Sequence, residues 1–241
     1  MRAGVRHQLK QDRFSQVTMK AAEDTVHWSV EHRTRLMVGA VIALVVAGGA
    51  FGGWYFLNQQ DQRASLELSQ AVRTMDTSLR PANMPPEPEN PTFASSKERA
   101  TEANKQLQGI LEKYPHTRSA EFARYFLGVT AINMGDDAGA TRQFQSVADS
   151  HNANLSALAK MALASLYRSQ HQDKQAIELY KALIAKPAET VGKTTAQIGL
   201  AETYEADGQP LEAKQIYQQI QKENPTTAAA QLAQEKLQSL K

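Results

Sequence analysis

The residues able to do chemistry are few, and they form no recognisable catalytic motif. The six histidines are scattered, and His116, His151 and His171 fall at predicted helix junctions, where a solvated side chain is expected. Asp136 and Asp137 follow a glycine in a predicted turn, where paired acids more often cap the next helix than bind a metal. The sequence contains no phosphate-binding glycine loop, Gly-x-Ser-x-Gly, His-Glu-x-x-His or calcium loop. We therefore expect no enzyme, no cofactor and no metal site.

The composition limits the classes of function further. The chain has 241 residues, of which 41% are hydrophobic and 22% charged, as in a folded protein of one or two domains. The formal net charge of +2 is too small to indicate a nucleic-acid partner. Because the chain has no cysteine, disulfides, thiolate zinc sites and a cysteine nucleophile are excluded. An enzyme with an unrecognised site would need ionisable groups with perturbed pKa values in a concave pocket.

One long apolar run, residues 36–57, is predicted to be a transmembrane helix. Its 22 residues include no charged side chain and would span about 33 Å as a helix, while a bilayer core of about 30 Å needs about 20 residues. Trp54 and Tyr55 lie near one end, where such rings favour the membrane interface. The alternatives are a buried core helix and a signal peptide cleaved after Gly48-Gly49-Ala50. The long leader and the apolar run beyond that site argue against cleavage.

The flanking charges predict the orientation of this helix. Residues 1–35 contain seven basic and four acidic side chains, a net charge of +3, with Arg33 and Arg35 at the membrane edge. Because basic flanks stay in the cytoplasm, we expect a bacterial inner-membrane protein with a cytoplasmic N-terminus and a periplasmic C-terminal part. The basic cytoplasmic tail 1–35 is either loosely ordered or lies on the anionic inner leaflet.

Small residues recur at four-residue intervals inside the apolar run. Gly48 and Gly52 are four apart, and so are Gly49 and Gly53. Such spacing lets membrane helices approach closely, so these glycines are candidates for a contact with a second copy or with a partner's helix. The alternative is that glycine is simply common in membrane helices.

Residues 58–94 are expected to connect this helix to a folded domain at 95–241. Residues 63–79 have helical spacing and extend the membrane helix, whereas residues 80–92 contain five prolines, which favour a loop or an extended linker. From residue 95 onward the pattern is helical, and it opens with a capping box in which Ser95 precedes Glu98 by three residues.

Three stretches of this domain repeat with a period of 36 to 37 residues. Their order is a leucine, a small residue and an aromatic, then an alanine, an aromatic, an apolar residue and a proline, which is Pro187 after the second copy and Pro225 after the third. The copies contain Leu127-Gly128, Ala131, Gly135, Ala140, Phe144 and Val147; Leu163-Ala164, Tyr167, Ala176, Tyr180 and Leu183; and Leu200-Ala201, Tyr204, Gly208, Ala213, Tyr217 and Ile220. A partial fourth copy upstream, around Leu107 and Ile110, shows only its second helix.

The pattern resembles the tetratricopeptide repeat, a pair of antiparallel helices of about 34 residues. The resemblance implies an all-α fold in which a transmembrane helix precedes a solenoid of helical hairpins, and the alternative is a non-repeating helical bundle. Three departures are the first tryptophan position, occupied by Arg124, Lys160 and Gln197, the replacement of the expected aromatic by Ala131 in the first copy, and a period two or three residues longer than usual. A last helix over 226–241, capped by Asn224-Pro225, is expected to cover the end of the stack.

Repeats of this type usually bind proteins or peptides on the concave face, which the first helix of each pair lines. By position this face would contain Phe122, Tyr125, Val129, Ile132 and Asn133; Leu158, Met161, Ser165 and Arg168; and Thr195, Ile198, Glu202 and Glu205. It would be apolar near the membrane and acidic at the far end, which suits a peptide with apolar anchors. Alternatively, Phe122, Val129 and Ile132 pack against the linker or the upstream helix.

The order of basic tail, membrane helix and repeat domain is similar to that of the ancillary subunit of the bacterial Sec translocon. This resemblance implies association with the translocon and with a membrane-anchored periplasmic chaperone. The expected function is therefore a membrane-anchored interaction module that assists protein translocation or periplasmic chaperoning. The main alternative is a scaffold for envelope assembly, cell division or a secretion machine.

Overall fold

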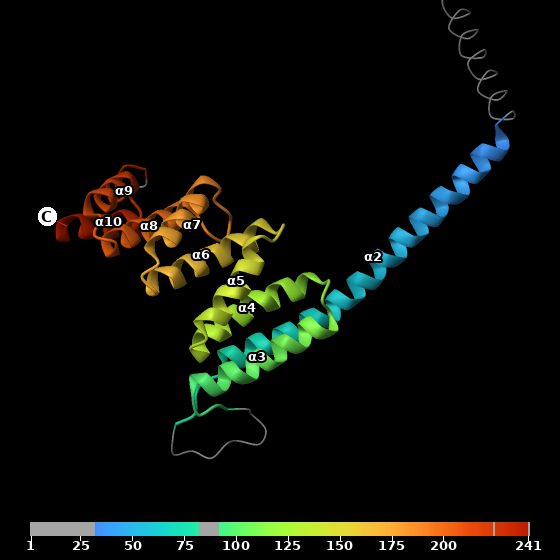
Figure 1. The fold of residues 1–241 in the computed structure, drawn as a ribbon, viewed down its shortest axis with the longest axis horizontal. Helices are drawn as coiled ribbons and strands as arrows, with labels where there is room; N and C mark the ends of the chain where they lie inside the picture. Colours follow the sequence, from blue (N-terminus) through green and yellow to red (C-terminus); the bar gives the residue numbers. More distant parts are fainter. Residues whose placement is uncertain (1–31, 82–91, 224, 241) are drawn as a thin grey trace, which may run out of the picture. The chain divides into compact units, whose positions relative to one another are not determined.

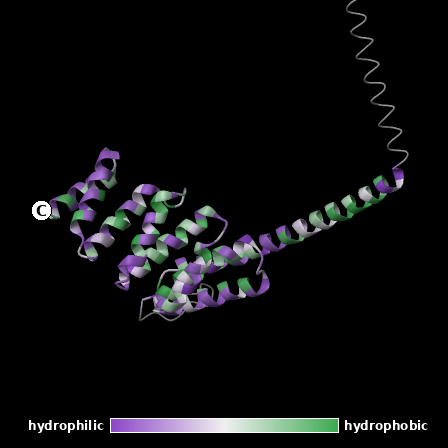
Figure 2. Ribbon diagram, turned by 45° about the horizontal axis from the view of Figure 1, so that its top comes forward, coloured by the Kyte–Doolittle hydropathy of each residue, from purple (hydrophilic) through white to green (hydrophobic). Residues whose placement is uncertain are grey.

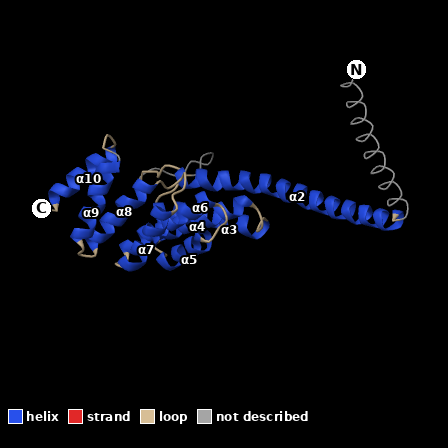
Figure 3. Ribbon diagram, turned by 90° about the horizontal axis from the view of Figure 1, so that it is seen from above, coloured by secondary structure: helices blue, strands red, loops and turns tan. Residues whose placement is uncertain are grey.

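The structure is a computed structural model that describes residues 32–81, 92–223 and 225–240. The predicted all-α class is confirmed, because the described residues form helices and no strand beyond an isolated bridge between Leu79 and Phe93 (Figure 3). Predictions for residues 1–31 and for most of the proline-rich stretch fall outside these ranges. The helices are α2 (Arg33–Asp76), α3 (Ser96–Lys113), α4 (Arg118–Met134), α5 (Asp137–Ala148), α6 (Ala153–Ser169), α7 (Asp173–Ala185), α8 (Lys193–Ala206), α9 (Pro210–Glu223) and α10 (Ala228–Ser239).

Helix α2 contains the predicted membrane segment. Among the described helices it is the one whose length and apolar composition would allow it to cross a membrane. Hydrophobic residues dominate the part of α2 that lies outside the repeat domain (Figure 2). Their side chains are exposed; Leu44, for example, is 72% exposed. Exposed apolar surface of this extent is typical of a segment that contacts lipid or another protein.

The second part of α2 belongs to the folded domain. Contacts divide the chain into Met1–Phe56 and Leu57–Lys241, so residues 57–76 lie in the same compact unit as the repeats. Ala64 and Ala71, two helical turns apart, are fully buried in a cluster with Leu107 and Ile110 of α3 and Leu127 of α4 (Figure 1). This stretch therefore occupies the place of the first helix that the partial upstream copy lacks in sequence.

Polar contacts hold this stretch at its N-terminal end. Asp61 Oδ1 accepts a hydrogen bond from the backbone N–H of Ser119, 2.9 Å away, in the first turn of α4. The Glu67 carboxylate accepts from Lys113 Nζ and from the Tyr114 hydroxyl, both at 3.0 Å, at the end of α3. The bond to Glu67 raises the pKa of both the Lys113 ammonium and the Tyr114 hydroxyl.

Side-chain caps begin most of the later helices. Half of the expected capping box is present, since Ser95 accepts from the Glu98 N–H, whereas the Glu98 carboxylate accepts from the N–H of Ala94, one residue before the cap, at 2.7 Å. Asp136 caps α5 in the manner expected of a turn acid, through the Gly139 N–H at 2.8 Å. For α10 the cap is Thr227 and not Asn224-Pro225, so the last helix begins later than we predicted.

Helices α4–α5, α6–α7 and α8–α9 form successive hairpins, and α10 packs on the last of them. Each first helix also contacts the first helix of the next hairpin, as α4 does α6, α6 does α8 and α8 does α10. In the described chain no such contact joins the second helices α5, α7 and α9. Because the first helices approach one another more closely, the stack is concave on their side, which we call the inner face.

Close packing of rings on glycines fixes the distance between helices. A Cβ added to Gly128 in α4 would lie 2.5 Å from Cε1 of Phe144 in α5. A Cβ on Gly199 of α8 would likewise collide with the ring of Tyr180 in α7. A side chain at either glycine would therefore force the two helices apart or displace the ring.

The loop before α8 lies between the second and third copies, which are 37 residues apart. Its residues 186–192 fold back onto the start of α6, where Asn154 Oδ1 accepts from the Glu189 N–H at 3.1 Å. The Thr190 hydroxyl donates to the Asn154 carbonyl at 2.7 Å, and Val191 is buried in the main core cluster. The loop residues are thus packed against the domain and do not interrupt the stack.

The Gly128–Phe144 contact predicts that alanine substitutions at two glycines change the free energy of unfolding in opposite directions. Gly128→Ala should lower the free energy of unfolding by about 1–3 kcal/mol, because the ring has to move. Gly109→Ala, in α3 with open space around the added carbon, should raise it by about 0.5–1 kcal/mol through helix propensity. Urea denaturation of the two variants measures both values, and equal effects would contradict the packing argument.

The buried seam of α2 predicts that the folded unit needs residues 57–76. A fragment 57–241 should unfold cooperatively on heating. A fragment 95–241 should be less stable by about 3 kcal/mol or more, because Leu107, Ile110 and Leu127 lose apolar cover. Circular dichroism against temperature and urea compares them, and equal stability would show that α2 contributes nothing to the unit.

Candidate protein interface

The residues predicted for the concave face lie on the first helices α4, α6 and α8, and each is half-buried or exposed. Because these helices contact one another, they bring side chains from three hairpins onto the inner face. Whether this face binds a partner stays a prediction. The residues concerned are Phe122, Tyr125, Val129, Ile132 and Asn133 on α4, Leu158, Met161 and Arg168 on α6, and Ile198, Glu202 and Glu205 on α8.

The apolar residues of α4 are partly used in packing toward the next hairpin. Phe122 and Tyr125 pack against a cluster of α5 and α6 residues, and Val129 against the cluster that contains Phe144. These contacts are downstream, whereas we had considered packing against the linker or the upstream helix. Burial raises the pKa of the Tyr125 hydroxyl. Ile132 is 42% exposed and is the most accessible large apolar side chain of this part.

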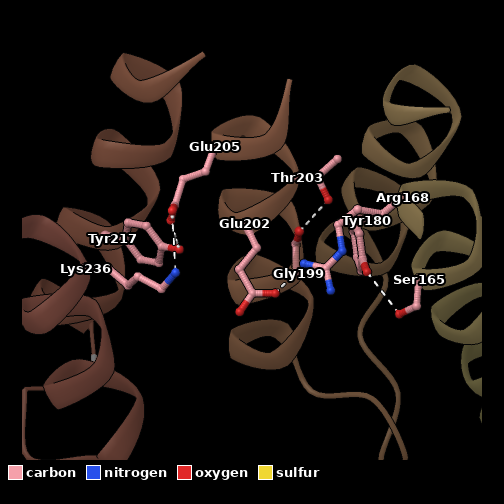
Figure 4. Close-up of polar contacts among 9 residues, drawn as sticks. All are labelled: Ser165, Arg168, Tyr180, Gly199, Glu202, Thr203, Glu205, Tyr217 and Lys236. Carbon is pink, nitrogen blue, oxygen red and sulfur yellow. Dashed lines mark hydrogen bonds and ion pairs between the residues drawn. The ribbon is translucent and has the colours of Figure 1, made fainter. Parts of the chain in front are cut away.

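The far end of the inner face is not acidic, contrary to our expectation. Glu202 of α8 accepts a hydrogen bond from the guanidinium of Arg168 on α6. Glu205, one turn further along α8, pairs with Lys236 Nζ of α10 at 3.4 Å (Figure 4). Burial alone would lower the pKa of Arg168, but the bond to Glu202 and the charge interactions with Glu202 and the two tyrosines together raise it. The four charges therefore cancel.

Two tyrosines on the second helices α7 and α9 add their hydroxyl groups to the polar side chains of the inner face. The Tyr180 hydroxyl lies 3.3 Å from Ser165 Oγ, and the Tyr217 hydroxyl donates to the Glu205 carboxylate (Figure 4). Burial and then the bond to Glu205 raise the pKa of Tyr217 far above its usual value. Phe144 holds the equivalent position in the first copy and has no hydroxyl, which matches the apolar surroundings on α4.

Sequence reasoning missed Lys236 and the role of Tyr217. Lys236 lies in a helix that the sequence analysis predicts only as an end cap, and no spacing in the sequence marks this lysine as a partner of Glu205. The tyrosine hydroxyl has no sequence signal, because it reaches the inner face only through the packing of its ring.

Other candidate features lie outside the inner face. In the described ranges no three acidic or histidine side chains are placed to hold a metal ion. A shallow polar hollow of about 410 Å³ lies between α2 and α3, lined by Glu67, Gln70, Lys105 and their neighbours. Gly48, Gly49, Gly52 and Gly53 have open space where a Cβ would stand, so their helix contact stays a prediction.

The buried Tyr217 hydroxyl predicts a pH-dependent effect on stability. Tyr217→Phe should lower the free energy of unfolding at pH 7 by about 1–3 kcal/mol, because Glu205 loses a buried donor. The pKa of Tyr217 is raised on folding, so its contribution is complete below about pH 10, where a free tyrosine begins to ionise, and is lost as pH rises further.

Urea denaturation at pH 7 and pH 10.5 tests this prediction. The difference between the parent chain and the Phe variant should be smaller at the higher pH. Tyr167→Phe is the matched control, because the Tyr167 hydroxyl bonds only to the exposed Gln145 amide, and its effect should be below about 0.5 kcal/mol. A difference that grows with pH would contradict the assigned direction.

Comparisons with known proteins agree with this architecture. A kinesin light chain of Podosopora anserina with nearly identical TPR-like repeats has a similar fold, with a TM-score of 0.56 and 18% identity over 75% of this chain and 85% of that one. A second structure of the same protein gives the same TM-score and identity, with 86% of its length covered. At this identity the likeness shows the fold alone. A comparison with curated proteins finds no match.

The family profile of the tetratricopeptide repeat-like domain matches residues 26–241. This range includes α2 together with every hairpin of the inner face. The predicted solenoid of helical hairpins is therefore confirmed by the helices, by the structural neighbours and by the family match. The chain belongs to the tetratricopeptide repeat-like domain family.

Proposed function

We propose that this chain is a membrane-anchored protein–protein interaction module whose inner face binds partner proteins. The observation that carries this proposal is the inner face itself. Equivalent positions of successive first helices present half-buried apolar side chains beside a hydrogen-bonded polar layer. Partly exposed apolar residues next to ordered polar groups are the composition of a binding surface.

The anchor in this proposal is residues 36–57, with a cytoplasmic N-terminus and a periplasmic repeat domain in a bacterial inner membrane. The support is the exposed apolar surface of α2 and the basic flank before it. The glycines at 48, 49, 52 and 53 would then contact a partner's membrane helix or a second copy. The lipid bilayer and other proteins are thus the two kinds of partner.

Within this proposal the chain acts as an accessory factor of protein translocation or periplasmic chaperoning. The support is the order of tail, membrane helix and repeat domain, which is similar to that of the translocon's ancillary subunit. A scaffold for envelope assembly, cell division or a secretion machine would use the same binding surface. The identity of the bound proteins separates these functions.

Photo-crosslinking in native membranes tests the proposal. A crosslinker at Ile132 on the inner face should give protein adducts, whereas one at Leu211 on α9, which is 71% exposed, should give few. A third position, Gly49, reports contacts of the membrane helix. Adducts are identified by mass spectrometry.

Translocon subunits or a periplasmic chaperone at Ile132 would support the accessory role. Division, envelope or secretion-machine proteins would favour the scaffold. If Ile132 gave no more adducts than Leu211, the inner face would not be the binding surface, and the proposed function would lose its basis.

A further inference from the structure

The start of α4 is bonded to α2 just beyond the predicted membrane segment. That segment ends at Leu57, which belongs to the same compact unit as the repeats. Asp61 follows four residues later in α2, which places it about 6 Å further along the helix axis. Its Oδ1 accepts from the Ser119 N–H at 2.9 Å, and its carbonyl accepts from the Ser119 hydroxyl at 3.5 Å. The first turn of α4 is therefore held at the level of Asp61.

This level corresponds to the headgroup layer of a bilayer. A hydrocarbon core of about 30 Å in a bilayer of about 40–45 Å leaves roughly 5–8 Å for the headgroups on each side. In the proposed anchor Leu57 marks the edge of the core, and Trp54 and Tyr55 just before it are side chains that favour the interface. Asp61 and the start of α4 thus reach the outer part of the headgroup layer.

Two exposed guanidinium groups lie at this level. Arg63 is on α2, two residues after Asp61, and Arg118 is the first residue of α4. Within the described ranges neither forms an ion pair with a carboxylate, whereas Lys113 and Lys193 are each paired with a glutamate. A guanidinium presents several N–H donors in one plane, which matches the oxygens of a phosphate group.

The carboxylates near this level are already used inside the protein. Asp61 accepts from the backbone of α4, and Glu121, one turn further along α4, accepts from a hydroxyl of the α5–α6 turn at 2.8 Å. Glu67 and the end of α3 bonded to it lie about 9 Å further along α2. Residues 57–63 and 115–119 contain two arginines and one aspartate, a formal net charge of +1 with histidine neutral. The surface at this level therefore offers its cations, and not its carboxylates, to the bilayer.

We propose that Arg63 and Arg118 bind the phosphate groups of anionic phospholipids in the leaflet from which α2 emerges. The occupant of this surface is thus the bilayer that holds residues 36–57. The contact gives the repeat domain a second attachment to the membrane, which restricts its rotation about the anchor. This inference rests on the proposed function, because it requires the membrane anchor and adds a lipid class to its partners.

A fluorescent label at residue 116 reports the contact, because His116 is exposed in the turn before α4 and the chain has no native cysteine. The full chain with His116→Cys is labelled and placed in nanodiscs of phosphatidylglycerol, with a nitroxide quencher on a fraction of the headgroups. Fluorescence lifetimes give the ratio of quenched to unquenched label. Because a basic residue at an anionic surface contributes about 5-fold to such an equilibrium, Arg63→Gln with Arg118→Gln should lower the ratio about 25-fold. Nanodiscs of phosphatidylcholine should lower it in the parent chain.

Arg142→Gln with Lys174→Gln is the matched control. Both side chains are exposed on the second helices α5 and α7, and the double substitution removes the same charge. The ratio for this variant should equal that of the parent chain. A fall as large as that of the variant at Arg63 and Arg118 would show an effect of net charge alone and would overturn the proposal.

A label introduced through Val46→Cys separates this proposal from the anchor itself. Its quenching by a nitroxide on the acyl chains shows that α2 is inserted in the bilayer. If the label at Val46 were quenched but the label at residue 116 stayed unquenched in phosphatidylglycerol, the headgroup contact would be wrong and the proposed anchor would stand. If neither label were quenched, both would be wrong.

Discussion

The contact of an aromatic ring with a residue that lacks a side chain sets the geometry of this domain. Phe144 against Gly128 and Tyr180 against Gly199 hold neighbouring helices closer than any larger residue would permit. The first helices also contact one another, so their outward side chains lie on one concave face. The same ring of Tyr180 carries its hydroxyl to Ser165 on that face. Core packing and the polarity of the inner face therefore depend on the same aromatic positions.

The repeat domain begins inside the helix that carries the predicted membrane segment. Ala64 and Ala71 are two small residues on one side of α2 that are buried against α3 and α4. On the same part of α2, Asp61 accepts a hydrogen bond from the start of α4, and Glu67 accepts one from the end of α3. The stack thus obtains its first helix from a segment that also extends the apolar run.

Much of the fold could be predicted because its signals are local. Helix spacing, the Ser95 cap and three copies in register identify the hairpins without tertiary information. The packing of residues 57–76 into the repeat domain could not be predicted. Ala64 and Ala71 form no recognisable motif, and residues 82–91 separate them in sequence from α3 and α4, on which they pack. The charge of the inner face also depends on tertiary contacts: Glu202 and Glu205 are acidic in sequence, and only packing shows that Arg168 and Lys236 neutralise them.

The central claim, that the inner face is occupied by protein in the membrane, is most directly tested by thiol labelling. Because the chain has no cysteine, single cysteines at Ser165 on the inner face and at exposed Ser146 on the second helix α5 can be labelled one at a time. The account predicts that a membrane-impermeant thiol reagent labels Ser165→Cys slowly in native spheroplasts and rapidly after purification in detergent, while Ser146→Cys reacts alike in both. Equal rates for Ser165→Cys in the two states would contradict it.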